Sequence, residues 1–357
     1  MLLRNVRSQE RAERLLAAAY ASRRLSHAYL FAGPVGTGKL SSALALASAV
    51  ICEDESGWCG ECRHCTRIAR FDHPDVRLTI PTTKSVSPEE IGQLMQTRAE
   101  DGVTPLRFPG NTYIGIDHIR RIEARLARKA FESGWRVEIL IDVHRMNEQA
   151  ANALLKSLEE PPSDTLFILS TSAIQWLLPT IRSRAHLVRF GRVSGGDIAG
   201  LLAERTGMEE EAAARIAASA EGSPGRALLM ARDGEAPGRE ALELLKELRA
   251  LTSDAEVVGL AAKTAKSQGR DGTMQIAAAL RSLAHDLVRA SEGAAPLYHL
   301  AGDLPDWRPS PAGASRELMA TLSRAEKRLQ RYVPPAMALL PPMLELRRVL
   351  GGRSDVE

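Results

Sequence analysis

The stretch from Gly33 to Leu40, with the sequence Gly-Pro-Val-Gly-Thr-Gly-Lys-Leu, constrains the fold of this chain more than any other segment. Its glycines and lysine match most of the phosphate-binding loop pattern G-x-x-x-x-G-K-[ST]. An apolar stretch typical of a buried strand, Ala28 to Ala32, precedes the loop, and an Ala- and Leu-rich segment without helix breakers, Ser41 to Cys52, follows it. Free N–H groups and the dipole at the start of such a helix favour a phosphate. Strand, loop and helix in this order predict an α/β domain with a phosphate site; the alternative is a chance glycine turn.

Two positions depart from what a hydrolysing site requires. The pattern ends in a hydroxyl that binds Mg²⁺, but this chain has Leu40, whose side chain cannot coordinate a cation. A second apolar strand, Val137 to Asp142, ends in an acid suited to holding Mg²⁺, yet the next residue, where a Glu would polarise water, is Val143. We therefore expect no intrinsic ATP hydrolysis, while the loop N–H groups and the lysine ammonium leave nucleotide or phosphate binding open. The candidate residues of this degenerate site are Gly33, Gly36, Gly38, Lys39 and Asp142.

A second candidate site is a cysteine cluster. All four cysteines of the chain fall within one short segment, at Cys52, Cys59, Cys62 and Cys65. Four thiolates at this spacing fit a closed tetrahedral Zn²⁺ site, which we expect to be structural because no ligand position is left open. An iron–sulfur cluster uses related spacing, and unligated core thiols are the remaining alternative. His64 lies inside the cluster, but the four thiolates already satisfy the metal, so we expect it to take no part in ligation.

Length and composition indicate several domains with a high helical content. The chain has 357 residues, and about 150 residues per domain predicts two or three domains. Its hydrophobic content of 44% with only 4% aromatic residues favours helices over a β-sandwich. Further strands are expected at 76–80 and 166–170, but after Arg192 the sequence shows only helical patterns. One of those helices carries an apolar stripe that we expect to face a core: Ile276, Leu280, Leu283 and Leu287.

The predicted division of the chain has three parts. A P-loop domain covers 1–192, with the cysteine module at about 52–65, and a helical lid covers 193–234. A Gly/Pro-rich linker from Gly234 to Gly238 then opens a helical region that covers 235–357. Four prolines are expected to break up the last helix of that region, because proline removes a backbone donor. They are Pro334, Pro335, Pro341 and Pro342.

Charge gives little support for a nucleic-acid partner. Lys+Arg 47 against Asp+Glu 44 leaves a net charge of +3, too small to imply nucleic acid from charge alone. A local exception is the helix expected over 119–131, capped by Asp117, whose basic residues form either a solvated face or a surface that tracks DNA phosphates. Those residues are Arg120, Arg121, Arg125, Arg128 and Lys129. No apolar run approaches the roughly 20 residues of a spanning helix, so we expect a soluble, cytoplasmic chain.

Several longer motifs are similar to those of one family. They are His27–Phe31, His73–Asp75, Ile116–Arg120, Ala151–Pro162 and Leu178–Arg184. Together with the order of strands, phosphate loop and helices, they resemble bacterial members of the AAA+ clamp-loader family, strongly from about Ser26 to Arg232 and weakly beyond. The resemblance implies a RecA-like α/β AAA+ domain with a zinc module, followed by an all-α lid and an all-α C-terminal collar that serves in oligomerisation.

Within that family, Leu40 and Val143 distinguish between two branches. Gamma/tau ATPases keep a hydroxyl and an acid at these positions, so the chain looks like the delta-prime branch, the largely non-hydrolysing stator of DNA polymerase III clamp loaders. This resemblance implies gamma/tau and delta partners in a hetero-oligomer that loads the sliding clamp onto primed DNA, with Zn²⁺ as a structural cofactor. The alternatives are an active gamma/tau-type ATPase and a zinc-containing nucleic-acid-binding module, which only the basic helix supports.

The resemblance also implies roles for two arginines. Arg184, in Ser183-Arg184-Ala185, corresponds to the arginine that delta-prime subunits give in trans to a neighbouring ATPase, although the family usually has Cys where Ala185 stands. Such a finger stabilises transition-state charge and can be worth about 10³ to 10⁵ in rate. The other explanation is a surface arginine in a turn. Arg226 lies where family ATPases carry a lid arginine that senses phosphate; here we expect a remnant or an intra-domain ion-pair partner.

Overall fold

The computed structural model describes residues 8–54, 57–83, 85–106, 108, 112–233, 239–291, 293–294, 312–330 and 333–351. These residues fall into two compact units. The first comprises the described parts of Met1–Phe108, Thr112–Leu201 and Gly222–Leu229. The second comprises those of Leu202–Glu221 and Met230–Glu357.

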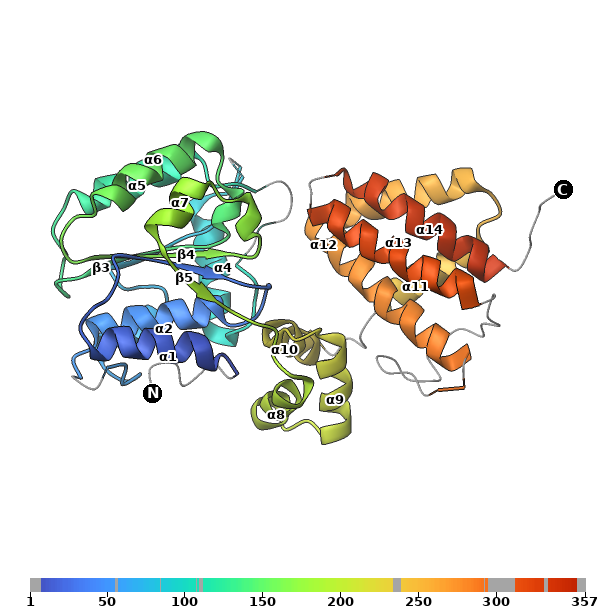
Figure 1. Ribbon diagram of the computed structural model, residues 1–357, viewed down its shortest axis with the longest axis horizontal. Coiled ribbons are helices and arrows are strands. Elements are labelled where there is room, and N and C mark those ends of the chain that lie inside the picture. Colours follow the sequence, from blue (N-terminus) through green and yellow to red (C-terminus); the bar gives the residue numbers. More distant parts are fainter. Residues whose placement is uncertain are drawn as a thin grey trace. The chain divides into compact units, whose positions relative to one another are not determined.

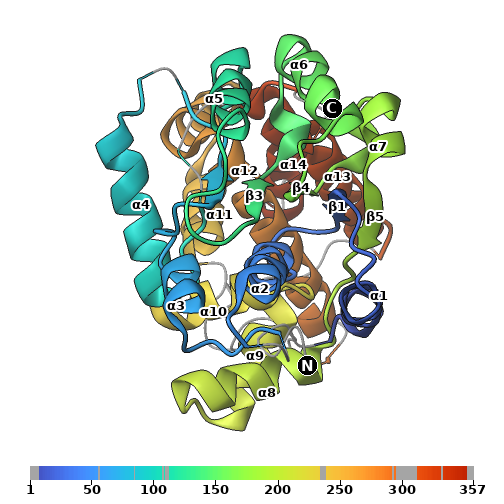
Figure 2. The same ribbon diagram turned by 90° about the vertical axis from the view of Figure 1, so that its left-hand side faces the viewer.

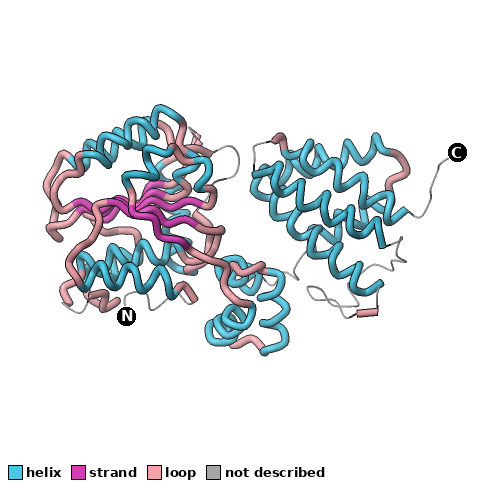
Figure 3. Tube along the Cα trace, viewed as in Figure 1, coloured by secondary structure: helices cyan, strands magenta, loops and turns pink. Residues whose placement is uncertain are grey.

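The first unit is built on a parallel sheet (Figures 1 and 3). Its described strands run in the order β2-β3-β4-β1-β5. They are β1 (Ala28–Ala32), β2 (Val76–Thr79), β3 (Arg136–Leu140), β4 (Thr165–Thr171) and β5 (His186–Arg189). β1 lies between β4 and β5, with Tyr29 opposite Ile168 and His186. β1 and β4 are buried along their whole length, which is typical of a sheet covered by helices on both faces.

Helices cover the two faces of this sheet, as Figure 1 shows and Figure 2 shows after a 90° turn. On one face lie α1 (Glu10–Ala21), α2 (Lys39–Ile51) and α3 (Arg63–Ala69); on the other lie α5 (Ile116–Leu126), α6 (Glu148–Glu159) and α7 (Pro179–Arg184). Successive side chains of a strand point to opposite faces, so Tyr29 and Phe31 enter the first core while Ala28 and Leu30 enter the second. α4 (Pro88–Asp101) begins with a capping box at Ser87.

Only helices are described after β5, as the sequence predicts. They are α8 (Gly195–Thr206), α9 (Glu210–Ser219), α10 (Pro224–Asp233), α11 (Arg239–Ala250), α12 (Asp254–Ser291), α13 (Ala312–Gln330) and α14 (Pro335–Gly351). In the second unit α11 to α14 enclose one apolar core, and the predicted stripe of α12 is buried in it, which confirms that expectation. The predicted linker from Gly234 to Gly238 lies outside the described residues, and the lid and collar boundaries stay predictions.

Three expectations about individual elements are wrong. β5 is a strand that the sequence did not predict; it is short, with only Val188 fully buried. The basic helix α5 begins at Ile116 with Gly115 as its N-cap, so Asp117 lies in the first turn and the helix ends at Leu126. α14 continues through Pro341 and Pro342, because its apolar residues are held in the core of the second unit.

Two smaller elements complete the description. They are the 3₁₀ turns η1 (Val143–Arg145) and η2 (Ile174–Trp176).

Within the described ranges, no helix combines the length and the apolar character needed to cross a membrane.

Candidate functional site

The phosphate loop connects β1 to α2, where the sequence predicts it. Gly36 and Gly38 have φ values of 75° and 94°, a left-handed conformation that favours glycine. Gly33 is needed for another reason, since a Cβ on it would lie 2.3 Å from the Phe190 carbonyl oxygen. The loop therefore has the backbone that its glycines predict.

The lysine of the loop is engaged by the loop itself. The Lys39 Nζ donates hydrogen bonds to the carbonyl oxygens of Gly33, at 2.7 Å, and Pro34, at 2.5 Å. The residue is 8% exposed, so its ammonium is buried among these acceptors. A phosphate at this position would have to compete for the ammonium with these two carbonyl groups.

The beginning of α10 lies directly on the same loop, and all residues concerned belong to the first unit. The Gly225 N–H donates a 3.0 Å hydrogen bond to the Gly36 carbonyl oxygen. A Cβ on Gly36 would lie 2.1 Å from the Ser223 Oγ and 3.4 Å from the Arg226 backbone nitrogen. The structure thus brings the backbone of Arg226 to the phosphate loop, through a packing contact that only glycine permits.

The groups that would complete a hydrolytic site are replaced by core residues. Leu40 packs against the apolar core of the face that α1 and α2 cover, and Val143 is 1% exposed in the core of the other face. Asp142 follows β3 with a positive φ of 50° and is 6% exposed. Since β1 and β3 are parallel, Asp142 lies at the same edge of the sheet as the phosphate loop, with β4 between them. The carboxylate is retained at this edge while its hydroxyl and acidic partners are absent.

Arg184 lies at the opposite edge of the sheet from its own phosphate loop. α7 ends at Arg184 and β5 begins at His186, whereas the phosphate loop follows the end of the parallel neighbour β1. The length of β1 separates the two, about 15 Å at a rise of about 3.3 Å per residue. The guanidinium donates to the Thr180 carbonyl oxygen at 3.0 Å and forms a 2.5 Å ion pair with Glu159 at the end of α6. Its side chain is 33% exposed, so the ion pair with Glu159 lies at the surface.

The four predicted cysteines come together. Their sulfur atoms all lie within 4.8 Å of one another, with Cys52 at 3.5 Å from Cys59 and 3.9 Å from Cys62, and Cys59 at 3.9 Å from Cys65. A tetrahedral Zn²⁺ with Zn–S bonds of about 2.3 Å places its sulfurs about 3.8 Å apart. Backbone N–H groups also point at the sulfurs, among them Cys62 N to Cys59 Sγ at 3.3 Å. The donor set and its spacing therefore fit a Zn²⁺ ion.

The thiols of this cluster have unequal acidities. Burial raises the pKa of Cys65, and burial also raises the pKa of Cys52. Burial acts the same way on Cys62, but N–H donors from Cys65 and Glu53 outweigh it and bring the pKa of Cys62 to about 7. Cys62 is also the N-cap of α3, where its side chain accepts the Cys65 N–H. A metal ion binds the thiolate forms, so binding at this cluster would release protons.

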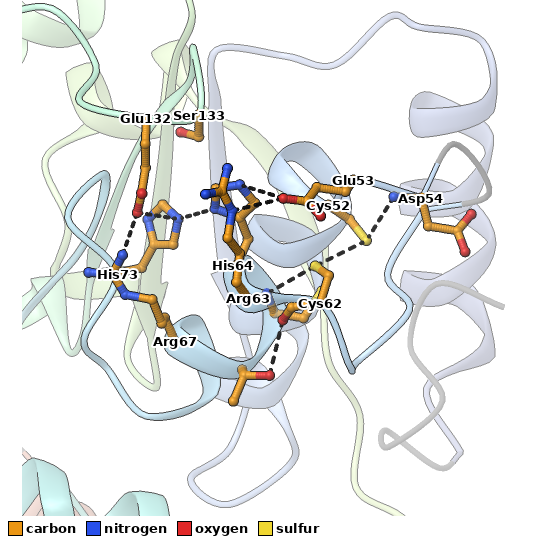
Figure 4. A network of polar contacts seen from close by, with 12 residues as sticks. Cys52, Glu53, Asp54, Cys62, Arg63, His64, Arg67, His73, Glu132 and Ser133 are labelled. Atoms are coloured by element: carbon orange, nitrogen blue, oxygen red, sulfur yellow. Dashed lines mark hydrogen bonds and ion pairs between the residues drawn. The ribbon is translucent and has the colours of Figure 1, made fainter.

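Beside the cysteines lies a network of polar groups that the sequence did not predict (Figure 4). His64 and His73 are buried, and His64 Nδ1 lies 2.8 Å from His73 Nε2. Glu132 lies 3.8 Å from His73 Nε2 and forms a 2.5 Å ion pair with Arg67 of α3. His64 thus has a structural partner, the imidazole of His73. The His-Pro-Asp motif that contains His73 was the available signal.

The basic surface predicted along α5 does not form as one face. Arg125 makes a bidentate ion pair with Glu138 of β3, at 2.9 and 2.8 Å, and Glu138 is 3% exposed. Burial raises the pKa of Glu138, and the Arg125 guanidinium opposes that rise. Arg128 and Lys129 lie beyond the end of the helix. One of the five basic residues thus anchors α5 to the sheet and two lie outside the helix; the choice between a solvated face and a DNA-tracking surface stays a prediction.

Comparisons with known proteins agree with these observations. Residues 8–194 match the protein family described as DNA polymerase III, delta subunit. The DNA polymerase III subunit delta' of Bacillus subtilis is 36% identical over 183 residues, which cover 51% of this chain and 47% of that protein. Subunit tau of the same organism is 32% identical over 227 residues, which cover 61% of this chain and 35% of that protein. The chain thus spans about half, or less, of the length of these relatives.

A solved structure aligns over a larger part of the chain. The gamma-subunit-related protein of DNA polymerase III from Thermotoga maritima aligns with 94% of this chain and 99% of that chain, at 15% sequence identity and a TM-score of 0.45.

Proposed function

The chain belongs to the DNA polymerase III delta-subunit family, and from this premise we propose that it acts as a delta-prime-type subunit of a clamp loader. In this proposal it joins gamma/tau and delta subunits in a cytoplasmic hetero-oligomer that places the sliding clamp on primed DNA. The helices of 193–234 would serve as the lid and those of 235–357 as the oligomerisation collar.

One observation carries the non-hydrolysing part of the proposal. Lys39 is held by two loop carbonyl groups, and the start of α10 is seated on Gly36. With Leu40 and Val143 in the cores, the site lacks both the metal-binding hydroxyl and the acid that would polarise water. An isolated chain of this kind has no means of catalysing ATP hydrolysis at its own loop.

The proposed contribution to catalysis is Arg184 acting on a neighbouring subunit. Its place at the edge of the sheet opposite its own phosphate loop supports a role in trans, because a finger for its own site would have to cross the length of a strand. An arginine supplied in this way stabilises charge on the γ-phosphate of another subunit and can be worth about 10³ to 10⁵ in rate.

The experiment measures ATP hydrolysis by the purified chain, alone and reconstituted with gamma/tau and delta subunits. We expect no turnover by the chain alone, and an Arg184→Ala complex that assembles normally but loses turnover at the site facing this subunit. Arg182→Ala, which removes the same charge from the same exposed helix, is the matched control. Mg²⁺-dependent turnover by the isolated chain would favour the gamma/tau-type alternative, and unchanged ATPase in the Arg184 complex would remove the finger assignment.

Zinc in the four-cysteine cluster is the remaining part of the proposal. Cys52, Cys59, Cys62 and Cys65 would hold the ion, which would cross-link the end of α2 to the start of α3. With four protein ligands the site is closed, so its role is structural. Metal analysis of the purified chain tests it directly, and a chain without zinc would contradict it.

A further inference from the structure

Two linked hydrogen bonds lead from the turn before β2 to His64, beside the cysteine cluster, and their direction is fixed at one end (Figure 4). The Asp75 backbone N–H lies 3.1 Å from the His73 Nδ1. A backbone N–H can only donate, so the His73 Nδ1 is the acceptor and the proton of this imidazole is on Nε2. His73 is 0% exposed, so no water competes for either nitrogen.

The second bond follows from the first. The His73 Nε2–H faces the His64 Nδ1 at 2.8 Å, so Nδ1 accepts and the proton of His64 is on Nε2. That nitrogen lies 3.4 Å from the Glu53 Oε1. One backbone donor thus sets the tautomers of two buried imidazoles and leaves the His64 Nε2 in electrostatic contact with the Glu53 carboxylate.

Glu53 connects His64 to the segments that carry the metal ligands. It directly follows Cys52, whose sulfur accepts the Asp54 N–H at 3.4 Å, and it pairs with Arg63, the residue after Cys62. The Arg63 Nε holds the same carboxylate oxygen at 2.9 Å. A fixed Glu53 side chain therefore restrains the turn after Cys52 and, through Arg63, the segment that carries Cys62.

The two histidines and Glu132 are themselves close enough to suggest a second metal site, but their geometry argues against it. Two imidazole nitrogens bound to one tetrahedral ion lie about 3.3 Å apart, whereas His64 Nδ1 and His73 Nε2 are 2.8 Å apart, a hydrogen-bond distance. The His73 Nε2 carries a proton and offers no lone pair. The Arg67 Nη1 lies 2.5 Å from the Glu132 carboxylate, where it would repel a divalent cation.

We propose that His73, His64 and Glu53 are positioning residues for zinc in the four-cysteine cluster. They hold the Cys52–Glu53 turn against the His73–Asp75 turn, so that the sulfur atoms of Cys52 and Cys62 are placed for the ion before it binds. Groups that orient metal ligands in this way typically contribute about 10- to 100-fold in affinity. The inference rests on the zinc part of the proposed function.

The experiment measures the Zn²⁺ dissociation constant of the full chain by competition with a chromophoric chelator, and the Co²⁺–thiolate absorption spectrum. Glu53→Ala removes the carboxylate that His64 and Arg63 contact. The Glu53 side chain is 52% exposed, so the fold is kept. Glu61→Ala is the matched control, an exposed Glu of the same module whose backbone alone contacts a cysteine. We expect Glu53→Ala to weaken Zn²⁺ binding by about 10-fold or more and Glu61→Ala to leave it unchanged.

A second pair of variants tests the hydrogen bond from His73 to His64. His73→Gln keeps an N–H that can donate to His64, whereas His73→Leu does not, so Gln should retain more affinity than Leu. The unfolding midpoint of the metal-free protein is measured alongside. A merely structural role would lower this midpoint and leave the Zn²⁺ affinity of the folded protein unchanged.

The outcomes separate this inference from its premise. A parent chain that binds no zinc would remove the proposed metal site itself. A parent that binds zinc as tightly as Glu53→Ala would overturn the positioning role. Two zinc ions per chain, with the second lost in His73→Gln, would show that the histidines are ligands.

Discussion

Replacing Asp75 with Asn is expected to destabilise the first unit by about 4 kcal/mol, because this carboxylate holds a whole turn. One carboxylate oxygen accepts the Phe131 N–H at 2.6 Å. The other accepts the N–H groups of Glu132 and Ser133, at 2.9 and 3.0 Å, and the Ser133 hydroxyl at 2.9 Å. Asp75 is 7% exposed, so water would not replace a lost partner.

The magnitude follows from counting these bonds. In the variant, the amide oxygen does best beside Glu132 and Ser133, which leaves the amide NH₂ facing the Phe131 N–H. A buried donor without an acceptor costs about 1–3 kcal/mol, and the other three bonds each lose about 1 kcal/mol with the charge. These terms are not fully additive, so about 4 kcal/mol is expected, a large part of the roughly 5–15 kcal/mol that stabilises a domain.

The assay is urea unfolding of parent and variant as a function of pH. Burial alone would raise the pKa of Asp75, but the N–H donors of Phe131, Glu132 and Ser133 outweigh it and lower the pKa below its ordinary value of 3.8. A lowered folded-state pKa adds stability that is fully present above about pH 4 and is lost as the pH falls through that pKa. The gap between parent and Asp75→Asn should therefore be constant from neutral pH down to about 5 and should narrow in acid.

Asp72→Asn is the control for this experiment, since Asp72 is an exposed carboxylate close by in the sequence. It should change the unfolding free energy by less than about 0.5 kcal/mol. A difference between parent and Asp75→Asn of under about 1 kcal/mol at neutral pH, or one that stays constant in acid, would show that the turn is held by other contacts.

Two further predictions concern an ion pair and the metal. Arg125→Leu leaves the buried Glu138 without its guanidinium and should lower the unfolding free energy by about 3–5 kcal/mol, whereas the double variant Arg125→Leu, Glu138→Leu should recover much of that loss; a single variant as stable as the parent would contradict the buried pairing. Removal of zinc by a chelator, or Cys62→Ser, should lower the thermal midpoint of the first unit in scanning calorimetry, with the second unit as an internal reference, and equal midpoints would contradict a structural metal.

Local patterns were enough to predict the parts of the fold that local interactions decide. The loop between Gly33 and Leu40, its strand and its helix follow from glycine conformation and apolar runs, and the spacing of the cysteines predicted their cluster. β5 was missed because it has only four residues and is mostly exposed, so it resembles a turn in sequence. The end of α5 was misplaced for a tertiary reason. The chain must leave the helix at Leu126 so that Phe131 can reach Asp75.

Contacts between distant segments were beyond the reach of sequence patterns. The His-Pro-Asp motif marks His73 but does not indicate that its ring meets His64, and Glu138 in an apolar strand gives no sign that Arg125 will neutralise it. Residue type and spacing were enough to identify the four cysteines as metal ligands. The side chains that position those cysteines come from other elements, so only the folded structure shows them.

The glycines of the phosphate loop need an explanation that does not depend on nucleotide. A loop that has lost its metal hydroxyl and its catalytic acid no longer needs glycine for phosphate binding. Gly36, however, accepts the Gly225 N–H and lies where any Cβ would meet the Ser223 Oγ. The same conformation that admits a phosphate in an active loop here admits the start of α10. Glycine at this position is thus favoured by its positive φ and by the packing of α10, independently of nucleotide, and restoring the hydroxyl at Leu40 would leave both α10 and the Lys39 hydrogen bonds in place.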